Sequence, residues 1–385
     1  MARHLTRHPI HGSLPRFVDP VEQDQKPIVS TVDVPERIPL TPAQRVTLMA
    51  RVILTTGLLL SMALLALAWI LPFKTDHDPS AYDTAAYFAF FTRVYQFQLG
   101  IACAVLAASL LMMRCWKRGL LALVLTVATV VPDLWIAREK TPPIAKGAPL
   151  RVMTVSMHAA LHDANSACEA ILDQKPDVVT VLQLTPSFAQ QIQTRLADAY
   201  PYRVVEPSEH YDGLAIFSKF PITLDSAPLD EGKRWLRTTL TWNDQPIDFY
   251  AIHFAPPQTI EGLRANRWQV GQILTDAADE RRPIVLAGDF NFTTMTSQAM
   301  ALKAAGFTDA HSIAGRDSGE TWPTAVAGKL VPAVRIDTVY TRGPLVATSS
   351  RVAQRFGSDH LPIVVDLSMT LPKKAATSPA TGSVK

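Results

Sequence analysis

Three long apolar segments and a later series of shorter apolar runs divide the chain into two regions. Uncharged apolar stretches of about 20 residues cover 52–71 and 94–113. A shorter apolar stretch over 119–136 contains Pro132 and one acid, Asp133. About 20 apolar residues in a helix cross the hydrocarbon of a bilayer. The pattern therefore predicts three transmembrane helices within residues 46–137. A buried core helix is the alternative for 119–136, but the tight basic turn RCWKRG before it favours a membrane hairpin.

The pattern changes at Leu150, where short strand-like runs begin to alternate with amphipathic helical stretches. Strands are predicted at 151–156, 177–184, 213–219, 235–242, 246–254, 283–290, 335–341 and 361–368, and helices at 164–174, 187–199 and 260–279. Several consecutive strands have no helix between them, which indicates an α/β domain with mixed sheets. Residues 150–370 are long enough for a single core formed by two sheets.

The remaining segments are polar or rich in proline. Residues 1–45 carry seven of the 29 prolines and no apolar run, so they are predicted to form a disordered arm. This start lacks the hydrophobic segment of a signal peptide. Residues 138–149 are interpreted as a linker, and the small, polar residues 371–385 as a disordered tail.

Composition agrees with a membrane protein. The chain is 48% hydrophobic and only 18% charged, with a mean hydropathy of +0.11, which argues against a purely soluble or a disordered protein. The net charge of +3 is unevenly distributed. Residues 1–149 hold 15 basic and 10 acidic residues, whereas residues 150–370 hold 19 and 24. The α/β domain is therefore acidic, and nucleic acid is not favoured as its partner.

Basic residues next to the apolar segments predict the membrane topology. Six of them flank the start of the first segment or fill the turn after the second: Arg37, Arg45, Arg51, Arg114, Lys117 and Arg118. The loop between these two segments has only Lys74 and Arg93. Because basic flanks stay in the cytoplasm, the arm is predicted inside and the α/β domain outside the membrane.

Candidate catalytic side chains cluster at predicted strand ends. Asp289 and Asn291 follow the run PIVLAG, and their spacing places both side chains on one face if the chain stays extended. An Asx-rich turn is the alternative for this pair. Asp359 and His360 precede the last strand and combine a metal-binding oxygen with a proton carrier.

Two further polar residues lie in apolar strands. His253 ends the strand PIDFYAIHF before two prolines, and Asp337 lies in RIDTVY, where an unpaired charge would be costly. Each of these positions alone is typical of a structural residue. Together, at the strand ends of one domain, they indicate an active site.

These motifs, in this order, resemble the endonuclease/exonuclease/phosphatase family, whose fold is shared with deoxyribonuclease I and sphingomyelinases. The similarity covers about residues 150–370 and includes LRVMTVS, PDVVTVLQLTP, GLAIFSKFP, AIHFAPP, AGDFN, TWP followed by RIDTVY, and SDHLP. It implies a two-sheet α/β sandwich, which here follows the three transmembrane helices predicted from the apolar segments. This arrangement resembles the membrane-bound bacterial branch of the family and implies a multi-pass protein of the bacterial cytoplasmic membrane.

The resemblance also implies roles for the candidate residues. His360 would be the acid–base histidine and Asp337 would orient it, while His253 would donate to the phosphate. Asp289 would activate the attacking water, and Asn291 would stabilise the pentavalent phosphorus. Asp359 would help to bind a divalent metal ion, Mg²⁺ or Mn²⁺, which acts as a Lewis acid in the hydrolysis of a phosphoester.

Two positions depart from the family's pattern. Ser156 stands where the family usually has Asn. At the place of its metal-binding Glu an alignment without gaps puts Gln183, and a shift by one residue puts Leu184, which offers no side-chain oxygen. Gln183 still offers a carbonyl oxygen but no charge, so a weaker metal site is expected. Arg264 and Arg267 share a helix face and could contact a substrate phosphate, although a solvated surface is the simpler interpretation. His158 and His162 are interpreted as loop residues.

Two hypotheses follow. The first is a membrane-anchored, divalent-metal-dependent phosphoesterase outside the cytoplasmic membrane, which hydrolyses a phosphomonoester or phosphodiester. A lipid-linked phosphate is one option, because the domain is tethered beside a bilayer. The second is a catalytically reduced family member that binds a phosphorylated ligand or a protein without turnover, which Ser156 and Gln183 favour.

Overall fold

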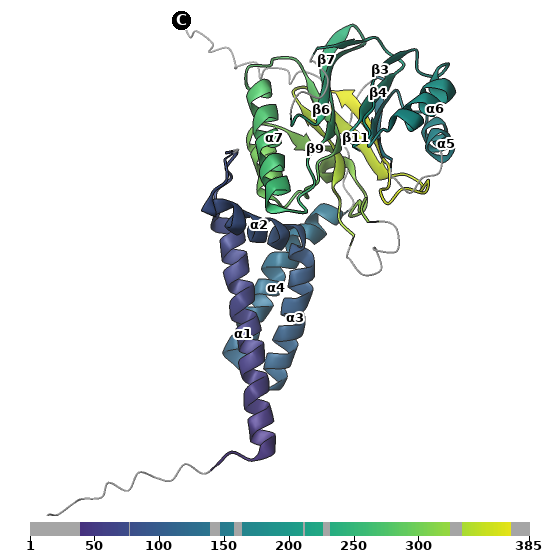
Figure 1. Cartoon of the computed structure of the whole chain (residues 1–385). Coiled ribbons are helices and arrows are strands. Elements are labelled where there is room, and N and C mark those ends of the chain that lie inside the picture. Colours follow the sequence, from purple (N-terminus) through teal and green to yellow (C-terminus); the bar gives the residue numbers. More distant parts are fainter. Residues whose placement is uncertain are drawn as a thin grey trace, which may run out of the picture. The chain divides into compact units, whose positions relative to one another are not determined.

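A computed structural model describes residues 39–76, 78–138, 147–157, 164–210, 212–225, 232–323 and 333–370 (Figure 1). Most of the predicted arm and linker, the whole predicted tail, and His158 and His162 lie outside these ranges. The arm was predicted to extend to residue 45, but a helix already begins at Pro42. The hydroxyl of Thr41 accepts from the backbone N–H of Gln44, and the Gln44 side chain accepts from the backbone N–H of Thr41. This reciprocal capping starts the helix earlier than its apolar pattern does.

Four helices form the apolar N-terminal region. They are α1 (Pro42–Ile70), α2 (Ala81–Val94), α3 (Gln96–Met112) and α4 (Trp116–Ala137). Among the described residues, α1 and the Trp116–Trp135 part of α4 are each long and apolar enough to cross a membrane. A third crossing exists if α2 and α3, which are bent by 75° at their junction, count as one span.

The second predicted span needs correction at its N-terminal end. The apolar stretch 94–113 does not start a new helix at Val94, because this residue is the last one of α2. The helix α2 was not predicted, because it contains the charged residues Asp83 and Arg93 and so is not an uncharged apolar stretch. The capping box between Ser80 and Asp83 starts this helix.

Two six-stranded mixed sheets form the α/β domain, as predicted. The first has the order β11-β12-β1-β2-β4-β3 and the second β5-β6-β7-β8-β10-β9. Each contains one parallel pair, β1 with β2 and β7 with β8. The strands of the first sheet are β1 (Leu150–Ser156), β2 (Val178–Leu182), β3 (Tyr202–Glu206), β4 (Leu214–Ser218), β11 (Leu345–Val352) and β12 (Ile363–Met369). The strands of the second are β5 (Ile222–Leu224), β6 (Trp235–Trp242), β7 (Gln245–His253), β8 (Ile284–Asp289), β9 (Thr308–Asp309) and β10 (Asp337–Arg342).

The sheets pack face to face and helices cover their outer faces. One core cluster joins residues of both sheets, among them Val152, Val178, Phe249 and Val285. A second cluster lies between the first sheet and the helices α5 (Asn165–Gln174) and α6 (Pro186–Leu196). A third lies between the second sheet and α7 (Ile260–Ala278) and α8 (Ser297–Ala304). Figure 1 shows α7 on one side of the sheets and α5 and α6 on the other; α9 (Ala310–Ala314) is short.

The strands that were predicted from the sequence are mainly those that are buried on both faces. All six residues of β8 are buried, so this strand is a continuous apolar run. β3 and β5 were missed because they are edge strands with exposed or half-buried residues. β11 was missed as well, since polar residues alternate along it.

Candidate active site

Four of the seven predicted site residues lie at or just after the matching ends of neighbouring strands in the second sheet. β7 and β8 run parallel, and their last residues, His253 and Asp289, are direct partners. β10 runs antiparallel to β8, so that its first residue, Asp337, is the partner of Asp289 on the other side. The strand directions therefore place His253, Asp289 and Asp337 side by side where β7 and β8 end and β10 begins.

A series of side-chain hydrogen bonds connects the two sheets at these strand ends. The Nδ1 atom of His360 and a carboxylate oxygen of Asp337 lie 2.8 Å apart, and both side chains are buried. The hydroxyl of Ser156, at the end of β1, donates to the other oxygen of Asp337 over 3.0 Å. Asp337, at the start of β10 in the second sheet, is thus bonded to β1 and to the loop before β12 of the first sheet. These bonds satisfy the buried carboxylate.

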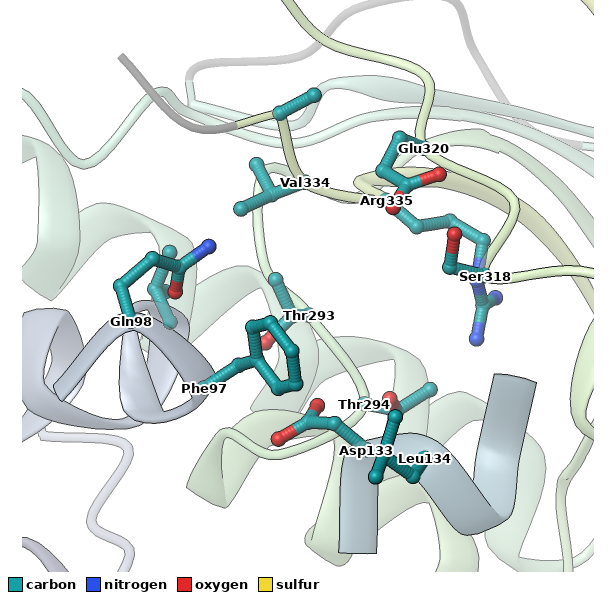
Figure 2. A pocket seen from close by; sticks show the side chains of 12 residues that line it. Phe97, Gln98, Asp133, Leu134, Thr293, Thr294, Ser318, Glu320, Val334 and Arg335 are labelled. Carbon is teal, nitrogen blue, oxygen red and sulfur yellow. The ribbon is translucent and has the colours of Figure 1, made fainter. Parts of the chain in front are cut away.

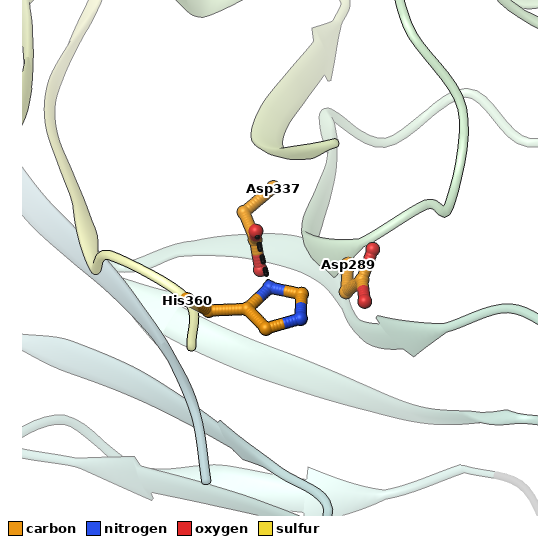
Figure 3. Close-up of side chains that lie close together, drawn as sticks. All are labelled: Asp289, Asp337 and His360. Carbon is orange, nitrogen blue, oxygen red and sulfur yellow. Dashed lines mark hydrogen bonds and ion pairs between the residues drawn. The ribbon is translucent and has the colours of Figure 1, made fainter. Parts of the chain in front are cut away.

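The loop that carries His360 is pinned to the same strand end. The hydroxyl of Ser358 donates to the carbonyl of Ser156 over 2.8 Å and accepts from the backbone N–H of His360 over 3.1 Å. Figure 3 shows Asp337 at one nitrogen of the His360 ring and Asp289 on the side of the other nitrogen. The ring therefore lies between two carboxylates.

Burial and charge shift the pKa values of these groups in different directions. Burial works to lower the pKa of His360, but the Asp337 carboxylate, with Asp289 and Asp359, raises it to about 9. Burial and then the charge of Asp337 raise the pKa of Asp289 to about 8. For His253, burial and then the positive charge of Arg234 lower the pKa to about 3. His360 is therefore a cation at neutral pH, whereas His253 is neutral.

Asn291 reaches the site through a turn, so the prediction of an extended chain was wrong at this position. Its φ of +55° lies in the left-handed region. Its backbone N–H donates to the Asp289 carboxylate over 2.8 Å, which forms the Asx turn considered as the alternative. Its amide nitrogen donates to the carbonyl of Phe254 over 2.9 Å.

Gly288 permits the approach of β8 to β7 beside the site. Its φ is +150°, and a Cβ atom there would lie 1.9 Å from the carbonyl oxygen of Ile252. Only glycine fits this position, which explains the residue that precedes Asp289 in the AGDFN motif.

One cavity of about 410 Å³ unites most of the predicted site. Six of the seven predicted residues line it: Gln183, His253, Asp289, Asn291, Asp359 and His360. Asp337, the seventh, lies behind His360. Gln183 follows β2 with a φ of +57°, and a carboxylate oxygen of Asp359 accepts from the indole N–H of Trp322 over 3.1 Å.

The donor set fits a divalent cation of the Mg²⁺ type. Ligand atoms of Asp289, Asp337 and His360 lie within 4.8 Å of one another, but the hydrogen bond between Asp337 and His360 already occupies two of these groups. Asp289, Asp359 and Gln183 offer hard oxygen donors in the cavity. Burial and then the charge of Asp337 raise the pKa of Asp289, and a bound cation would favour its ionised form.

Several cavity residues were missed by sequence reasoning. Arg234 lines the cavity near His253 and adds a positive charge. Trp322 belongs to the TWP motif. This motif was part of the resemblance to the family, but no role was predicted for its residues. Four apolar or aromatic residues come from outside the α/β domain: Phe90, Phe91 and Val94 from α2, and Tyr95 from its junction with α3. No local motif marks them, because only their position in the fold brings them to the site.

The two arginines of α7 do not have either of the predicted roles. Arg267 is 2% exposed, so it is not a solvated surface residue, and it forms a buried ion pair with Asp83 of α2. Arg264 lies 3.4 Å from the same carboxylate. Both arginines bind α2 to the α/β domain, and neither lines the cavity.

A second cavity of about 270 Å³ adjoins the first, since Val94 and Val334 line both (Figure 2). Asp133 of α4 lies at this cavity with Gln98, Thr293 and Arg335. Within the described part of the chain, one oxygen atom each of Asp133, Gln98 and Thr293 is buried without a hydrogen-bond partner. The acid of the third apolar segment therefore faces a polar space.

Comparison with known proteins identifies the family. The family model described as "Endonuclease/Exonuclease/phosphatase family" matches residues 157–360, just over half of the chain. No curated protein matches the chain. Solved structures with a similar fold include an endonuclease/exonuclease/phosphatase from Beutenbergia cavernae, with 21% identity over 58% of this chain and 72% of that one and a TM-score of 0.48.

Two further structures have comparable similarity. A humanized D. rerio TDP2 has 17% identity over 58% of this chain and 100% of that one, with a TM-score of 0.49. A family protein from Leptotrichia buccalis has 16% identity over 57% and 100% of the two chains, with a TM-score of 0.45. With the family model and the order of motifs in agreement, the chain belongs to the endonuclease/exonuclease/phosphatase family.

Proposed function

We propose that this protein is a membrane-anchored, divalent-metal-dependent phosphoesterase that hydrolyses a phosphomonoester or phosphodiester outside the cytoplasmic membrane. The observation that carries the proposal is the His360–Asp337 pair, which faces Asp289 at the wall of one cavity. A histidine oriented by a carboxylate beside a second carboxylate is an acid–base arrangement.

The two raised pKa values support complementary proton transfers by Asp289 and His360. Asp289, in its ionised form, is a stronger base than an ordinary carboxylate and accepts a proton from a water that attacks phosphorus in line. His360 is cationic at neutral pH and donates its Nε2 proton to the ester oxygen as the P–O bond breaks. Asp337 keeps the ring oriented through Nδ1 and stabilises its positive charge.

Neutral and cationic donors on the cavity wall bind the phosphoryl oxygens. His253 is neutral, so its ring N–H can donate to the phosphate, and Arg234 adds a charge-assisted donor. The Asn291 amide lies at the same wall, where its nitrogen donates to the Phe254 carbonyl and to the Asp289 carboxylate and so holds Asp289 in place. The donors from His253 and Arg234 favour the extra charge on oxygen in the transition state.

Gln183 and Asp359 are the residues that would hold Mg²⁺ or Mn²⁺, next to Asp289. When bound, the cation supplies Lewis-acid neutralisation of phosphoryl oxygen charge. Because Gln183 is uncharged, we expect a lower affinity than for a site with a carboxylate at this position.

The apolar helices and the charges at their ends support membrane anchoring. Arg51 donates to the carbonyl of Met113, so one end of α1 lies beside the α3–α4 turn with its basic residues. Arg93 donates to the carbonyl of Ala68, which places the other end of α1 beside α2. We infer three crossings, with the basic end in the cytoplasm and the α/β domain outside the cytoplasmic membrane of a bacterium.

The test is hydrolysis by the full-length protein in detergent, on a panel of phosphomonoesters and phosphodiesters with Mg²⁺ or Mn²⁺. His360→Gln and Asp289→Asn are expected to lower kcat by 100-fold or more, about the contribution of acid–base catalysis. His311→Gln is the matched control, because His311 is also buried but bonds Ser350 away from the cavity. Hydrolysis that survives in both site variants would refute the proposal.

A binding role without turnover is the second candidate, and Gln183 is the observation that favours it. In that case no ester in the panel is hydrolysed with either metal, while phosphorylated ligands still bind. Turnover gained only by Gln183→Glu would show that loss of one metal ligand converted an enzyme into a binding protein.

A further inference from the structure

The helix α2 forms one wall of the candidate active-site cavity, although it lies in the sequence between apolar segments and outside the α/β domain. Phe90, Phe91, Val94 and Tyr95 contribute this wall. The catalytic candidates and Arg234 line the same cavity. The cavity therefore combines an aromatic and aliphatic surface with a polar, phosphate-binding one.

Buried contacts hold α2 against the domain. The Asp83–Arg267 ion pair has side chains that are only 4% and 3% exposed, and Arg267 also donates to the carbonyl of Lys74. The hydroxyl of Tyr87 donates to the carbonyl of Gln258, at the cavity, over 3.0 Å. Phe90 is buried in the same core cluster as Phe254. The wall is therefore a fixed part of the site.

The position of α2 in the chain places it at the end of the membrane crossings. α1 ends at Ile70, and α3 begins one residue after α2 with a bend of 75°. Aromatic residues typical of the membrane interface lie at the neighbouring helix ends: Trp69, Tyr95 and Trp135. The 75° bend turns α2 away from the direction of α3, so we place α3 in the crossing and α2 along the bilayer surface.

We infer that the substrate is a lipid phosphate, whose phosphate binds among His253, Asp289 and His360 and whose hydrocarbon chain lies against Phe91, Val94 and Tyr95. This inference rests on the proposed function for the reaction, but its basis is the wall formed by α2. A water-soluble phosphoester would leave these apolar side chains in contact with water. A lipid buries them and enters from the surface on which α2 lies.

The experiment compares chain-bearing and chainless members of two substrate pairs with the full-length protein in detergent micelles. The monoester pair is phosphatidic acid and glycerol 3-phosphate, and the diester pair is phosphatidylcholine and glycerophosphocholine. We expect kcat/KM at least tenfold higher for the chain-bearing member of the pair that is hydrolysed. Phe91→Ala should lower it about tenfold for this member and less than twofold for the chainless one, as expected when a buried aromatic contact is lost.

Phe88→Ala is the matched control on the same helix. Phe88 is 55% exposed and does not line the cavity, so its loss should leave both members unchanged. Equal efficiency on both members, or equal losses on both in Phe91→Ala, would overturn the inference while the proposed hydrolysis stands.

A binding readout separates this inference from the proposed function. A fluorescent phosphatidic acid of short chain length is titrated into the wild type and into Phe91→Ala, with glycerol 3-phosphate as competitor. If no ester is hydrolysed but Phe91→Ala still weakens binding about tenfold, the proposed function fails and the lipid site stands. If binding of the lipid probe is equal in both proteins, the lipid site fails.

Discussion

Replacing Asp83 by Asn leaves the Arg267 guanidinium without its opposite charge in a buried position. Arg267 keeps its hydrogen bond to the Lys74 carbonyl, and the Tyr82 ring lies 5.0 Å from its guanidinium carbon. Removal of one partner of a buried ion pair costs about 3–5 kcal/mol, because the remaining charge stays desolvated. Since these two contacts remain, we expect a value near the lower limit, about 3 kcal/mol.

The expected loss is large enough for thermal unfolding. For a folded unit of this size each kcal/mol shifts Tm by about 2–4 °C, so the Asp83→Asn variant should melt about 6–12 °C below the wild type. Backbone amides of α2 should also exchange faster, because the ion pair fastens this helix to α7. Both are measured on the full-length protein in detergent, by differential scanning fluorimetry and by hydrogen–deuterium exchange.

A double-mutant cycle and a surface control test the cause. Arg267→Gln combined with Asp83→Asn should cost clearly less than the sum of the single changes, because neither charge is then left alone. Glu169→Gln removes one partner of the exposed pair with Arg195, where the Glu169 side chain is 69% exposed, and should shift Tm by less than 2 °C. A Tm and α2 exchange within error of the wild type in Asp83→Asn would refute the argument from buried charge.

Three further predictions concern single positions. Gly288→Ala, which directs a Cβ atom at the Ile252 carbonyl oxygen, should destabilise the fold by more than about 4 kcal/mol and abolish the cooperative melting transition; a normal transition would refute the packing argument. Burial works to raise the pKa of Asp309, but the Arg335 guanidinium lowers it to about 2 from an ordinary 3.8. A depressed folded-state pKa contributes stability above pH 4 that is lost as pH falls toward 2, so Asp309→Asn should lower Tm at pH 6 and flatten its decline in acid; an unchanged Tm–pH profile would contradict this. Gln183→Glu should tighten Mn²⁺ binding about tenfold in calorimetric titration, and unchanged affinity would place the cation elsewhere.

Much of the site was predictable because strand ends carry a local pattern. The apolar runs before Asp289 and up to His253 marked two buried strands, and both residues are the last ones of β8 and β7. Their register then follows from parallel pairing. The turn at Asn291 was less certain, because a left-handed residue and an extended one look alike in the pattern of polar and apolar positions.

The sequence by itself determined the two regions of the chain, the buried strands and the family, since periodicity and motif order are local properties. Only the tertiary structure decided that α2 forms a wall of the cavity. Asp83 and Arg267, which hold this helix in place, are 184 residues apart, and in the sequence each of them looks like an ordinary surface charge. It also decided that Ser156 bonds Asp337. A buried charge is stable only beside its partner, and folding brings the two together.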